Sequence, residues 1–336
     1  DFATLTVSGG IRYDTRIMEG RGLYLDDNEI IVEPSAPGAI QKFREFDNTF
    51  SGISGSLGLT YDISENLLAK FNFSRGFRAP NIAELAANGL HEGTIRYETG
   101  NSGLDAEGSW EFDFALGFNS HHVSVEADLF DNRIGNYIFL TKLKSTAGGD
   151  SLTEGYQTFR FISGNANLYG GEISIDIHPH PWDWLHFENT FSYVLATLES
   201  QPDSMKYLPF TPGPKFQSSL KTDIRKIGKV LGNAYIRLGF DNYFPHDRIY
   251  SAYDTETATD GYTLVNFGFG TDIISGKKTL CSLYFNITNL FDVAYQSHLS
   301  RLKYAGVNYI SGRTGVFDMG RNFGVKLIVP VSLRRG

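Results

Sequence analysis

The 336-residue chain has few of the features that mark disulfide-rich proteins, helical membrane proteins or nucleic-acid-binding proteins. It has a single cysteine, Cys281, so an intrachain disulfide is excluded. No stretch of about 18 consecutive apolar residues occurs, which excludes a membrane-spanning helix. Asp and Glu total 38 against 30 Lys and Arg, and the resulting net charge of −8 argues against the basic face that binding to nucleic acid requires.

The sequence shows instead a regular alternation of apolar and polar residues. In residues 123–129 every odd position is apolar and every even position is polar, and residues 172–178 repeat the pattern. A period of two predicts β-strands with two different faces. We predict about twelve strands, at residues 5–13, 53–61, 69–73, 110–118, 123–140, 158–177, 185–193, 216–224, 236–240, 265–269, 283–287 and 323–331.

The connections between these strands alternate between short turns and long loops. Transmembrane β-barrels of the bacterial outer membrane have short periplasmic turns and long extracellular loops. A soluble β-sandwich also has alternating strands, but it does not divide its connections into two such classes. We therefore predict an all-β, antiparallel transmembrane β-barrel in the bacterial outer membrane, with the long loops extracellular and both termini periplasmic. The short connections are residues 62–66, 119–122, 179–183, 225–230 and 274–278, and the long ones are residues 15–48, 75–107, 141–156, 200–214, 245–261 and 290–320.

Four segments carry a resemblance to a known family. They are residues 73–81 (Phe-Ser-Arg-Gly-Phe-Arg-Ala-Pro-Asn), residues 97–104, residues 286–295 and residues 320–323. In this order and spacing they resemble the conserved boxes of TonB-dependent receptors of the outer membrane. Ser102 stands where the family has a proline. The residues that match the family motifs are Phe77, Arg78, Ala79, Pro80, Asn101, Leu104 and Glu107.

This resemblance implies a 22-stranded barrel that is filled by an N-terminal plug domain and coupled to the TonB complex. With about twelve strands and no plug, residues 1–336 are expected to be the C-terminal portion of such a barrel. The implied partners are the TonB complex, contacted through the missing N-terminal region, the protein's own plug domain, and outer-membrane lipid. Because unpaired strand edges are not tolerated in lipid, the two open edges must pair with the missing half, or the sheet must close on itself.

The loop between the first two boxes contains a candidate ligand site. Family members that take up haem or metal carry a histidine in this interval, so the resemblance makes His91 a candidate ligand for haem iron or for a divalent metal. Glu92, Tyr97 and Glu98 would complete an oxygen-rich site. The alternative is an ordinary loop histidine, because no second histidine lies nearby in the sequence.

No catalytic arrangement is found in the chain, which has no G-x-S-x-G elbow, P-loop, paired cysteines or His-Glu-x-x-His. The His-Pro-His-Pro tract at residues 178–181 falls in a short connection, and we interpret it as turn chemistry. We expect no enzymatic activity and no resident cofactor apart from a transported haem or metal ion. The leading hypothesis is a receptor for TonB-energised uptake of an iron-siderophore, haem or a divalent metal. The alternatives are a stand-alone twelve-stranded barrel that acts as a passive pore or lipase, and a glycan-importing receptor of the same family.

Overall fold

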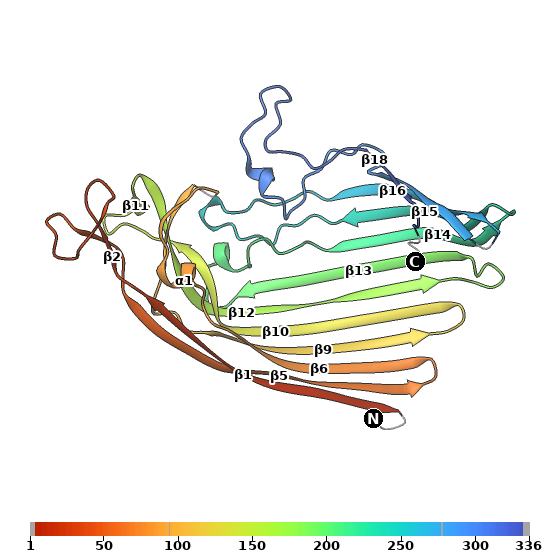
Figure 1. Ribbon diagram of the computed structural model, residues 1–336, viewed down its shortest axis with the longest axis horizontal. Coiled ribbons are helices and arrows are strands. Elements are labelled where there is room, and N and C mark those ends of the chain that lie inside the picture. Colours follow the sequence, from red (N-terminus) through yellow and green to blue (C-terminus); the bar gives the residue numbers. More distant parts are fainter. Residues whose placement is uncertain (1–3, 94, 277, 332–336) are drawn as a thin grey trace, which may run out of the picture.

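The computed structural model describes residues 4–93, 95–276 and 278–331. Within them, twelve long strands form a continuous antiparallel path in which each strand pairs with its neighbours along the chain (Figure 1). The prediction of an all-β antiparallel fold with this number of strands is confirmed. The strands are β1 (Leu5–Gly20), β5 (Phe46–Ser64), β6 (Leu67–Arg78), β9 (Glu107–Asn119), β10 (Val123–Lys142), β12 (Tyr156–Ile177), β13 (Leu185–Leu198), β14 (Lys215–Ile227), β15 (Leu231–Tyr243), β16 (Tyr262–Ser275), β17 (Lys278–Thr288) and β18 (Asn322–Ile328).

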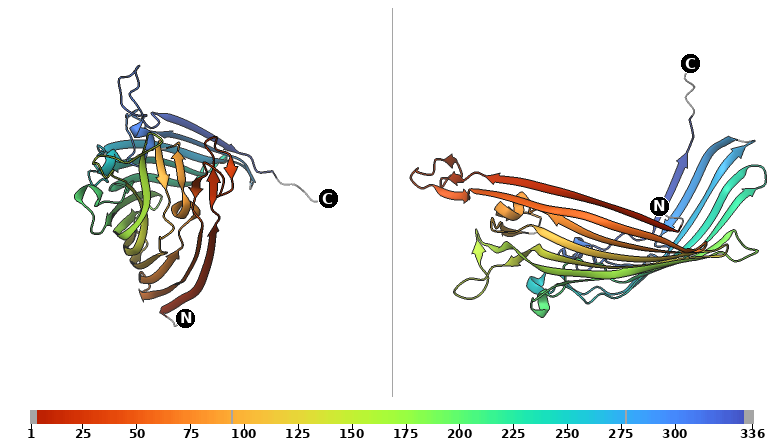
Figure 2. Two further views of the ribbon diagram at one scale, coloured as in Figure 1. Left: turned by 90° about the vertical axis from the view of Figure 1, so that its left-hand side faces the viewer. Right: turned by 90° about the horizontal axis from the view of Figure 1, so that it is seen from below.

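The sheet is bent into an open trough, as the two side views in Figure 2 show. Within the described residues, the sheet path begins at β1, which pairs with β5, and ends at β18, which pairs with β17. The two end strands therefore each leave one edge without a partner in this sheet. Because lipid supplies no hydrogen bonds to open strand edges, these edges require partner strands in a membrane.

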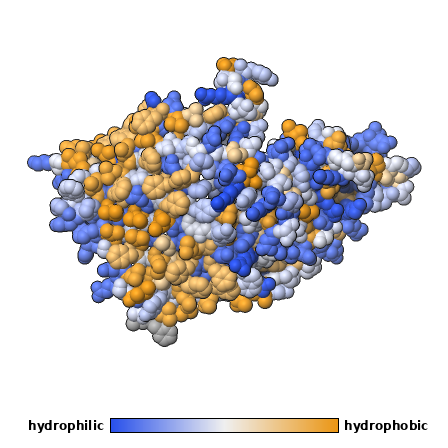
Figure 3. Space-filling view, turned by 180° about the vertical axis from the view of Figure 1, so that it is seen from behind, coloured by the Kyte–Doolittle hydropathy of each residue, from blue (hydrophilic) through white to orange (hydrophobic). Residues whose placement is uncertain are grey.

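The outer face of the trough is apolar. Phe114 of β9 lies in register between Phe71 of β6 and Leu129 of β10, and all three side chains are exposed. In Figure 3 such side chains form an orange band across the strands. Soluble proteins rarely expose apolar patches of this extent, whereas the wall of a membrane barrel requires one. On β9 alone the exposed apolar residues are Trp110, Phe112, Phe114, Leu116 and Phe118, each 38–44% exposed.

The strands have two kinds of end, the short-turn end and the long-loop end. Short turns join β5 to β6, β9 to β10, β12 to β13, β14 to β15 and β16 to β17, and the longer connections lie at the other end. The predicted alternation of short and long connections is thus confirmed.

Several strands extend further toward the long-loop end than the alternation predicts. β1 continues to Gly20, and its partner β5 begins at Phe46, far ahead of the predicted start. In this extension Met18, Phe46 and Phe50 are buried in a hydrophobic cluster, so the alternation of an apolar outer face with a polar inner face fades while the backbone pairing continues. In contrast, β18 is shorter than predicted, because it ends at Ile328 and not at residue 331. Pro330 has no backbone N–H to donate to a neighbouring strand, which is consistent with this early end.

The long loops contain short elements of their own. No helix in the described ranges is both long and apolar enough to cross a membrane. The short elements are β2 (Leu23–Leu25), β3 (Ile31–Val32), β4 (Ile40–Phe43), α1 (Ile82–Ala86), β7 (Asn88–His91), β8 (Arg96–Thr99), β11 (Leu152–Thr153), and the 3₁₀ turns Asp203–Met205, Ala252–Asp254 and Arg301–Tyr304.

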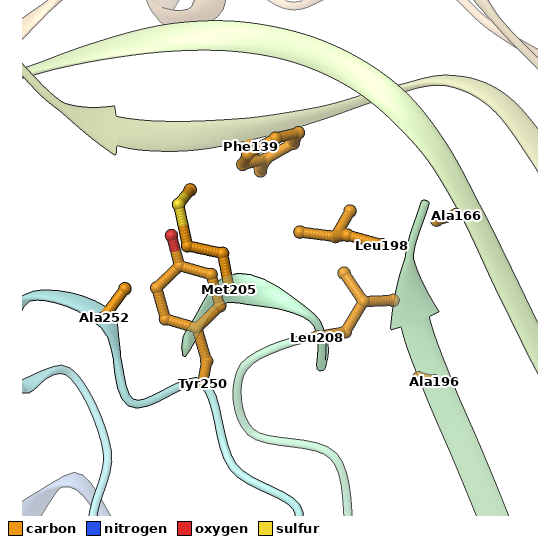
Figure 4. Packing of buried hydrophobic residues seen from close by; sticks show 8 residues of the cluster. All are labelled: Phe139, Ala166, Ala196, Leu198, Met205, Leu208, Tyr250 and Ala252. Atoms are coloured by element: carbon orange, nitrogen blue, oxygen red, sulfur yellow. The ribbon is translucent and has the colours of Figure 1, made fainter. Parts of the chain in front are cut away.

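A buried hydrophobic cluster holds two of the long loops against the strand ends. Figure 4 shows Met205 and Leu208 from one loop and Tyr250 from another, gathered beside Phe139 of β10 and Leu198 of β13. Burial of an aliphatic side chain of this size contributes roughly 1.5–3 kcal/mol. These loops are therefore packed parts of the structure, and they hold fixed positions above the trough.

Candidate ligand-binding sites at the long-loop end

The second long loop is anchored by an ion-pair network at its two ends. Arg78, the last residue of β6, lies opposite Glu107, the first residue of β9. Its Nε donates to Glu107 Oε2 at 2.6 Å, and its Nη1 donates to the two carboxylate oxygens of Glu84 at 3.0 and 3.1 Å. Glu107 Oε1 also accepts the backbone N–H of Ile138 at 2.8 Å. Charge-assisted and bidentate bonds of this kind fix both distance and orientation.

The short helix α1 is stabilised by the same network. Asn81 caps the helix by accepting the backbone N–H of Glu84 at 2.9 Å, and the Glu84 carboxylate accepts the backbone N–H of Asn81 at 2.7 Å. This reciprocal capping box satisfies donors that a free helix end would leave unpaired. A five-residue helix is too short to be stable alone, so its position depends on this cap and on Arg78.

The remaining family-motif residues pack around this anchor. Ala79 and Leu104 are buried in one hydrophobic cluster with Phe77 against it, and Pro80 is fully buried. The backbone N–H of Asn101 donates to the carbonyl oxygen of Glu84 at 2.8 Å. The motif residues predicted from the resemblance are therefore gathered in one place, where they fix the geometry of the loop.

The candidate ligand residues lie on the hairpin formed by β7 and β8 but do not share one face of it. His91 is paired with Arg96, and Tyr97 is paired with Leu90. Because successive residues of a strand point to opposite sides, Tyr97 points away from the side that carries His91 and Glu98. Glu92 lies exposed in the turn that follows β7.

Two of these candidates are engaged in other contacts. The Tyr97 ring is buried, and its hydroxyl donates to Asn88 Oδ1 at 2.9 Å. Glu98 Oε1 accepts Arg96 Nε at 2.8 Å. The structure thus places the four residues within one hairpin but does not aim them at a common point. The ligand role of His91, Glu92, Tyr97 and Glu98 stays a prediction.

A hollow of about 850 Å³ lies between the inner face of the trough and several long loops. Inner-face side chains of the strands line one side of it, and residues of three long loops line the other. The acidic lining residues are Glu111, Asp113, Asp128, Glu172 and Asp260, and the basic ones are Lys70 and Lys215. This excess of acidic groups favours ligands that carry positive charge or a metal ion.

Two histidines of separate loops meet at this hollow. The rings of His246 and His298 lie 4.4 Å apart between centroids in an edge-to-face arrangement. His298 Nδ1 is 2.8 Å from Thr259 Oγ1, and His298 Nε2 is 3.6 Å from the buried carboxylate of Glu256. Within the described part of the chain, neither Nε2 atom has a hydrogen-bond partner, although both are buried. Buried polar atoms are normally paired, so these two enclosed nitrogens are an exception that marks the cluster.

Burial also sets the charge of this cluster. Desolvation lowers the pKa of His298 to about 4, and the neighbouring His246 and Lys303 lower it as well. Desolvation likewise lowers the pKa of His246 and raises the pKa of Glu256. Both imidazoles are therefore neutral at pH 7, which is the form that coordinates metal or haem iron.

Sequence reasoning missed this cluster. His246, Glu256 and His298 lie in two different long loops and have no motif spacing. The two loops are brought together by the pairing of β15 with β16 and of β16 with β17. This pairing is a feature of the folded sheet and cannot be read from the spacing of the three residues in the sequence. A histidine in each of two adjacent long loops was the only signal available.

A curved antiparallel sheet with an apolar outer face and a polar inner face defines the class of outer-membrane β-barrel proteins. Residues 1–290 match the family model described as "TonB dependent receptor-like, beta-barrel". The chain belongs to the TonB-dependent receptor family. This membership agrees with the prediction of a non-enzymatic protein and places the chain in the outer membrane.

Solved structures with similar folds include the copper transporter OprC, which is 16% identical, with a TM-score of 0.74 over 97% of this chain and 46% of that one. The FrpB iron transporter from Neisseria meningitidis (F3-3 variant) is 13% identical, with a TM-score of 0.62 over 97% of this chain and 43% of that one. The Serratia marcescens hemophore receptor HasR, solved with its hemophore HasA and heme, is 14% identical, with a TM-score of 0.62 over 97% and 49%. The chain spans less than half the length of each of these proteins, and the likeness shows the fold alone.

Proposed function

We propose that this chain is the wall and loop portion of a TonB-energised importer for an iron-siderophore, haem or a divalent metal. The observation that carries the proposal is the pair of neutral imidazoles, His246 and His298, which line the hollow under the long loops and have enclosed Nε2 atoms without a hydrogen-bond partner in the described residues. The acidic lining of the hollow supports a metal-containing cargo. Proteins with similar folds include a copper transporter, an iron transporter and a hemophore receptor, which also supports a metal-containing cargo.

In this proposal the long loops face the outside of the cell and the short turns face the periplasm. The fixed loops hold the histidine pair where a ligand enters from outside. A plug domain inside the complete barrel prevents leakage, and work delivered through the TonB complex displaces it. The chain's own contribution is the lipid-facing wall, the positioned loops and the first contacts with the ligand.

A second candidate function, glycan import by a receptor of the same family, is favoured by one observation. Tyr243 and Tyr262 stack with ring centroids 4.4 Å apart, and Tyr262 and Tyr295 stack at 4.5 Å. Tyr243 and Tyr262 line the hollow, so aromatic rings and their hydroxyl groups form part of its wall. Sugars as well as aromatic iron chelators combine apolar surface with polar edges, and such ligands suit a lining of this kind.

The proposal is tested by uptake in a strain in which this receptor is the only route for the nutrient. Radiolabelled iron chelate, haem, zinc and a labelled oligosaccharide are supplied in turn, with and without a functional TonB complex. We expect TonB-dependent uptake of a metal-containing ligand, and at least about a tenfold loss of its affinity in the His246→Ala/His298→Ala variant. His121→Ala, in a turn at the other end, is the matched control and should leave affinity unchanged. Uptake of the oligosaccharide alone, or uptake without TonB, would refute the metal-importer proposal.

A further inference from the structure

Three metal-ligating side chains meet at the short-turn end, on the opposite end of the strands from the hollow and its loops. Asp176 is the penultimate residue of β12, His178 follows that strand, and His186 is the second residue of β13. One ligand atom from each lies within 4.8 Å of the others. All three side chains are partly buried, with exposures of 31, 19 and 23%.

The strand alternation explains why these side chains face one another. Ile177 of β12 is paired with Phe187 of β13, and both are exposed on the outer face. Their neighbours Asp176, His178 and His186 therefore point to the inner face. Two backbone hydrogen bonds close the turn between the two strands. The N–H of Trp182 donates to the carbonyl oxygen of Pro179, and the N–H of Leu185 donates to that of Trp182, both at 2.7 Å. The cluster is thus held by two paired strands and a tight turn.

The distances fit a small metal ion. His178 Nδ1 is 3.4 Å and His186 Nδ1 is 2.9 Å from the same oxygen, Asp176 Oδ2, and the two imidazole rings lie 5.2 Å apart between centroids. Two donor atoms that each lie about 2.1 Å from a tetrahedral ion are about 3.4 Å from each other. Of these two contacts, the one from His178 already has this value. The one from His186 is a hydrogen bond and requires an increase of about half an ångström, while all three ligand atoms lie within 4.8 Å of one another.

Unsatisfied atoms mark the same place. Within the ranges that the structure describes, His178 Nδ1 and Asp176 Oδ1 are enclosed and have no hydrogen-bond partner. Buried nitrogen and oxygen atoms of proteins are normally paired, and an exception calls for an explanation such as an ion. A metal ion bound by His178 Nδ1 would satisfy that atom, and an ion held by both carboxylate oxygens of Asp176 would satisfy Oδ1 as well.

Outer contacts orient the second histidine. His186 Nε2 is 3.6 Å from Asp223 Oδ2, and the same oxygen accepts a hydrogen bond from Lys221 Nζ at 2.8 Å. A carboxylate near the far nitrogen of a metal-binding imidazole favours the tautomer with the proton there, and in that tautomer Nδ1 can bind a metal in place of its hydrogen bond with Asp176 Oδ2. Lys221 lies beside the cluster, since it is paired with His186 across the two strands. Its positive charge contacts Asp223, which leaves Asp176 as the anionic ligand.

We propose that Asp176, His178 and His186 bind a divalent late first-row transition metal such as zinc, copper or nickel at the short-turn end. Imidazole nitrogens select these metals, whereas calcium and magnesium require sites built from oxygen. Three protein ligands leave a fourth position open to water or to a passing ligand. This site is independent of the proposed import function, since it uses other residues at the other end of the strands.

The test uses protein that has assembled in the membrane and is then extracted in detergent. It is titrated with zinc chloride, the affinity is measured by calorimetry, and the zinc ligands are identified by X-ray absorption at the zinc edge. We expect one tight site with two imidazole ligands, and at least about a 100-fold loss of its affinity in His178→Ala/His186→Ala. His180→Ala is the matched control, because His180 lies in the same turn but is exposed and outside the cluster. It should leave the zinc affinity unchanged.

Asp223→Asn keeps all three ligands and alters only the outer contact. We expect it to lower zinc affinity about tenfold, and its retained β-sheet circular dichroism distinguishes this loss from misfolding. Equal zinc affinity in the parent and the double-alanine variant overturns the proposed site, as does an equal loss in His180→Ala. If the parent protein binds zinc but fails to take up any of the nutrients, only the importer proposal is refuted. If it takes up a nutrient but binds no zinc tightly, only the zinc-site proposal is refuted.

Discussion

Two pairs of histidines, one at each end of the strands, invite comparison. His246 and His298 come from different long loops, and their ring centroids are 4.4 Å apart. His178 and His186 flank a single turn, and their ring centroids are 5.2 Å apart. Each pair has at least one enclosed ring nitrogen that lacks a hydrogen-bond partner within the described residues.

The two pairs differ in how their neighbouring carboxylate is used. Beside the loop pair, Glu256 accepts the backbone N–H groups of Phe210 and Tyr250 with its two oxygens. Beside the turn pair, Asp176 has one oxygen without a hydrogen-bond partner in the described part of the chain and one oxygen close to both rings. Glu256 is therefore committed to the backbone, whereas the close contacts of Asp176 are with the two imidazoles. We therefore expect the same residue types to give a contact point for ligands in one place and a metal site in the other.

The largest expected effect separates the two pairs directly. His246→Ala/His298→Ala should leave the zinc affinity of the turn within about threefold of the parent, because distant sites act independently. His178→Ala/His186→Ala should lower it at least about 100-fold. Calorimetric zinc titration of the two double variants side by side is the measurement. Loss of the tight zinc site in the loop variant would reverse the assignment.

The loop anchor provides the next largest effect. Arg78→Ala leaves the buried carboxylates of Glu84 and Glu107 unpaired and close together. Breaking a buried ion pair costs about 3–5 kcal/mol, and partial exposure of Arg78 reduces this to about 2–3 kcal/mol. We expect proteolysis within residues 75–107 to accelerate accordingly, with zinc binding at the turn unaffected. Arg78→Lys should restore only part of the protection, since lysine cannot form the bidentate pair. Unchanged protease resistance in Arg78→Ala would contradict the anchoring role.

Acidification should weaken the long-loop end. The pKa of His298 is lowered to about 4 by burial, whereas an unfolded imidazole titrates near 6.5. Between these pH values the unfolded loop binds a proton that the folded loop does not, so stability is complete above about pH 6.5 and is lost toward pH 4, by about 3 kcal/mol from this group alone. The lowered pKa of His246 acts in the same direction, and the raised pKa of Glu256 opposes it.

The measurement is the rate of loop proteolysis, with an acid-tolerant protease, as a function of pH. His298→Gln removes the titrating group, so its rate should depend less steeply on pH than that of the parent. Parallel pH profiles for the two proteins would show that His298 does not set the acid sensitivity of these loops.

A smaller effect is expected from one glycine of the second loop. A Cβ at Gly100 would lie 2.4 Å from the backbone nitrogen of Ala86, which cannot move without displacing α1. Gly100→Ala should therefore destabilise the loop by about 1–2 kcal/mol. Gly89→Ala is the control in the same loop, because a Cβ there meets no atom within 4 Å. Equal protease resistance of the two variants would refute the close approach of residue 100 to the helix.

The strands could be predicted because their signal is local. Residues 123–129 reveal two faces by themselves, and the length of each connection is visible directly. The strand ends were less predictable, as β1 and β5 show, because pairing continues where the regular alternation of apolar and polar residues is lost. The anchor was recognised only through resemblance, since Arg78 and Glu107 are brought together by strand pairing.

The sites were harder to predict because they depend on contacts between strands and between loops. The turn interpretation of residues 178–181 agrees with the structure, yet it overlooked that His178 shares the inner face with His186 of the next strand. Strand parity alone would have placed Asp176 and His178 on that face. His246 and His298 gave no comparable signal, because the conformation of long loops is not encoded in a periodic pattern.

The central claim is that one face of every long strand contacts lipid. It is tested most directly by spin labels placed singly along residues 110–118 in a Cys281→Ala background, in protein reconstituted into bilayers. We predict that collisions with lipid-soluble oxygen relative to a water-soluble nickel complex alternate along this strand, high at Phe114 and low at Asp113. A ratio that does not alternate, or that is low at every position, would contradict the account.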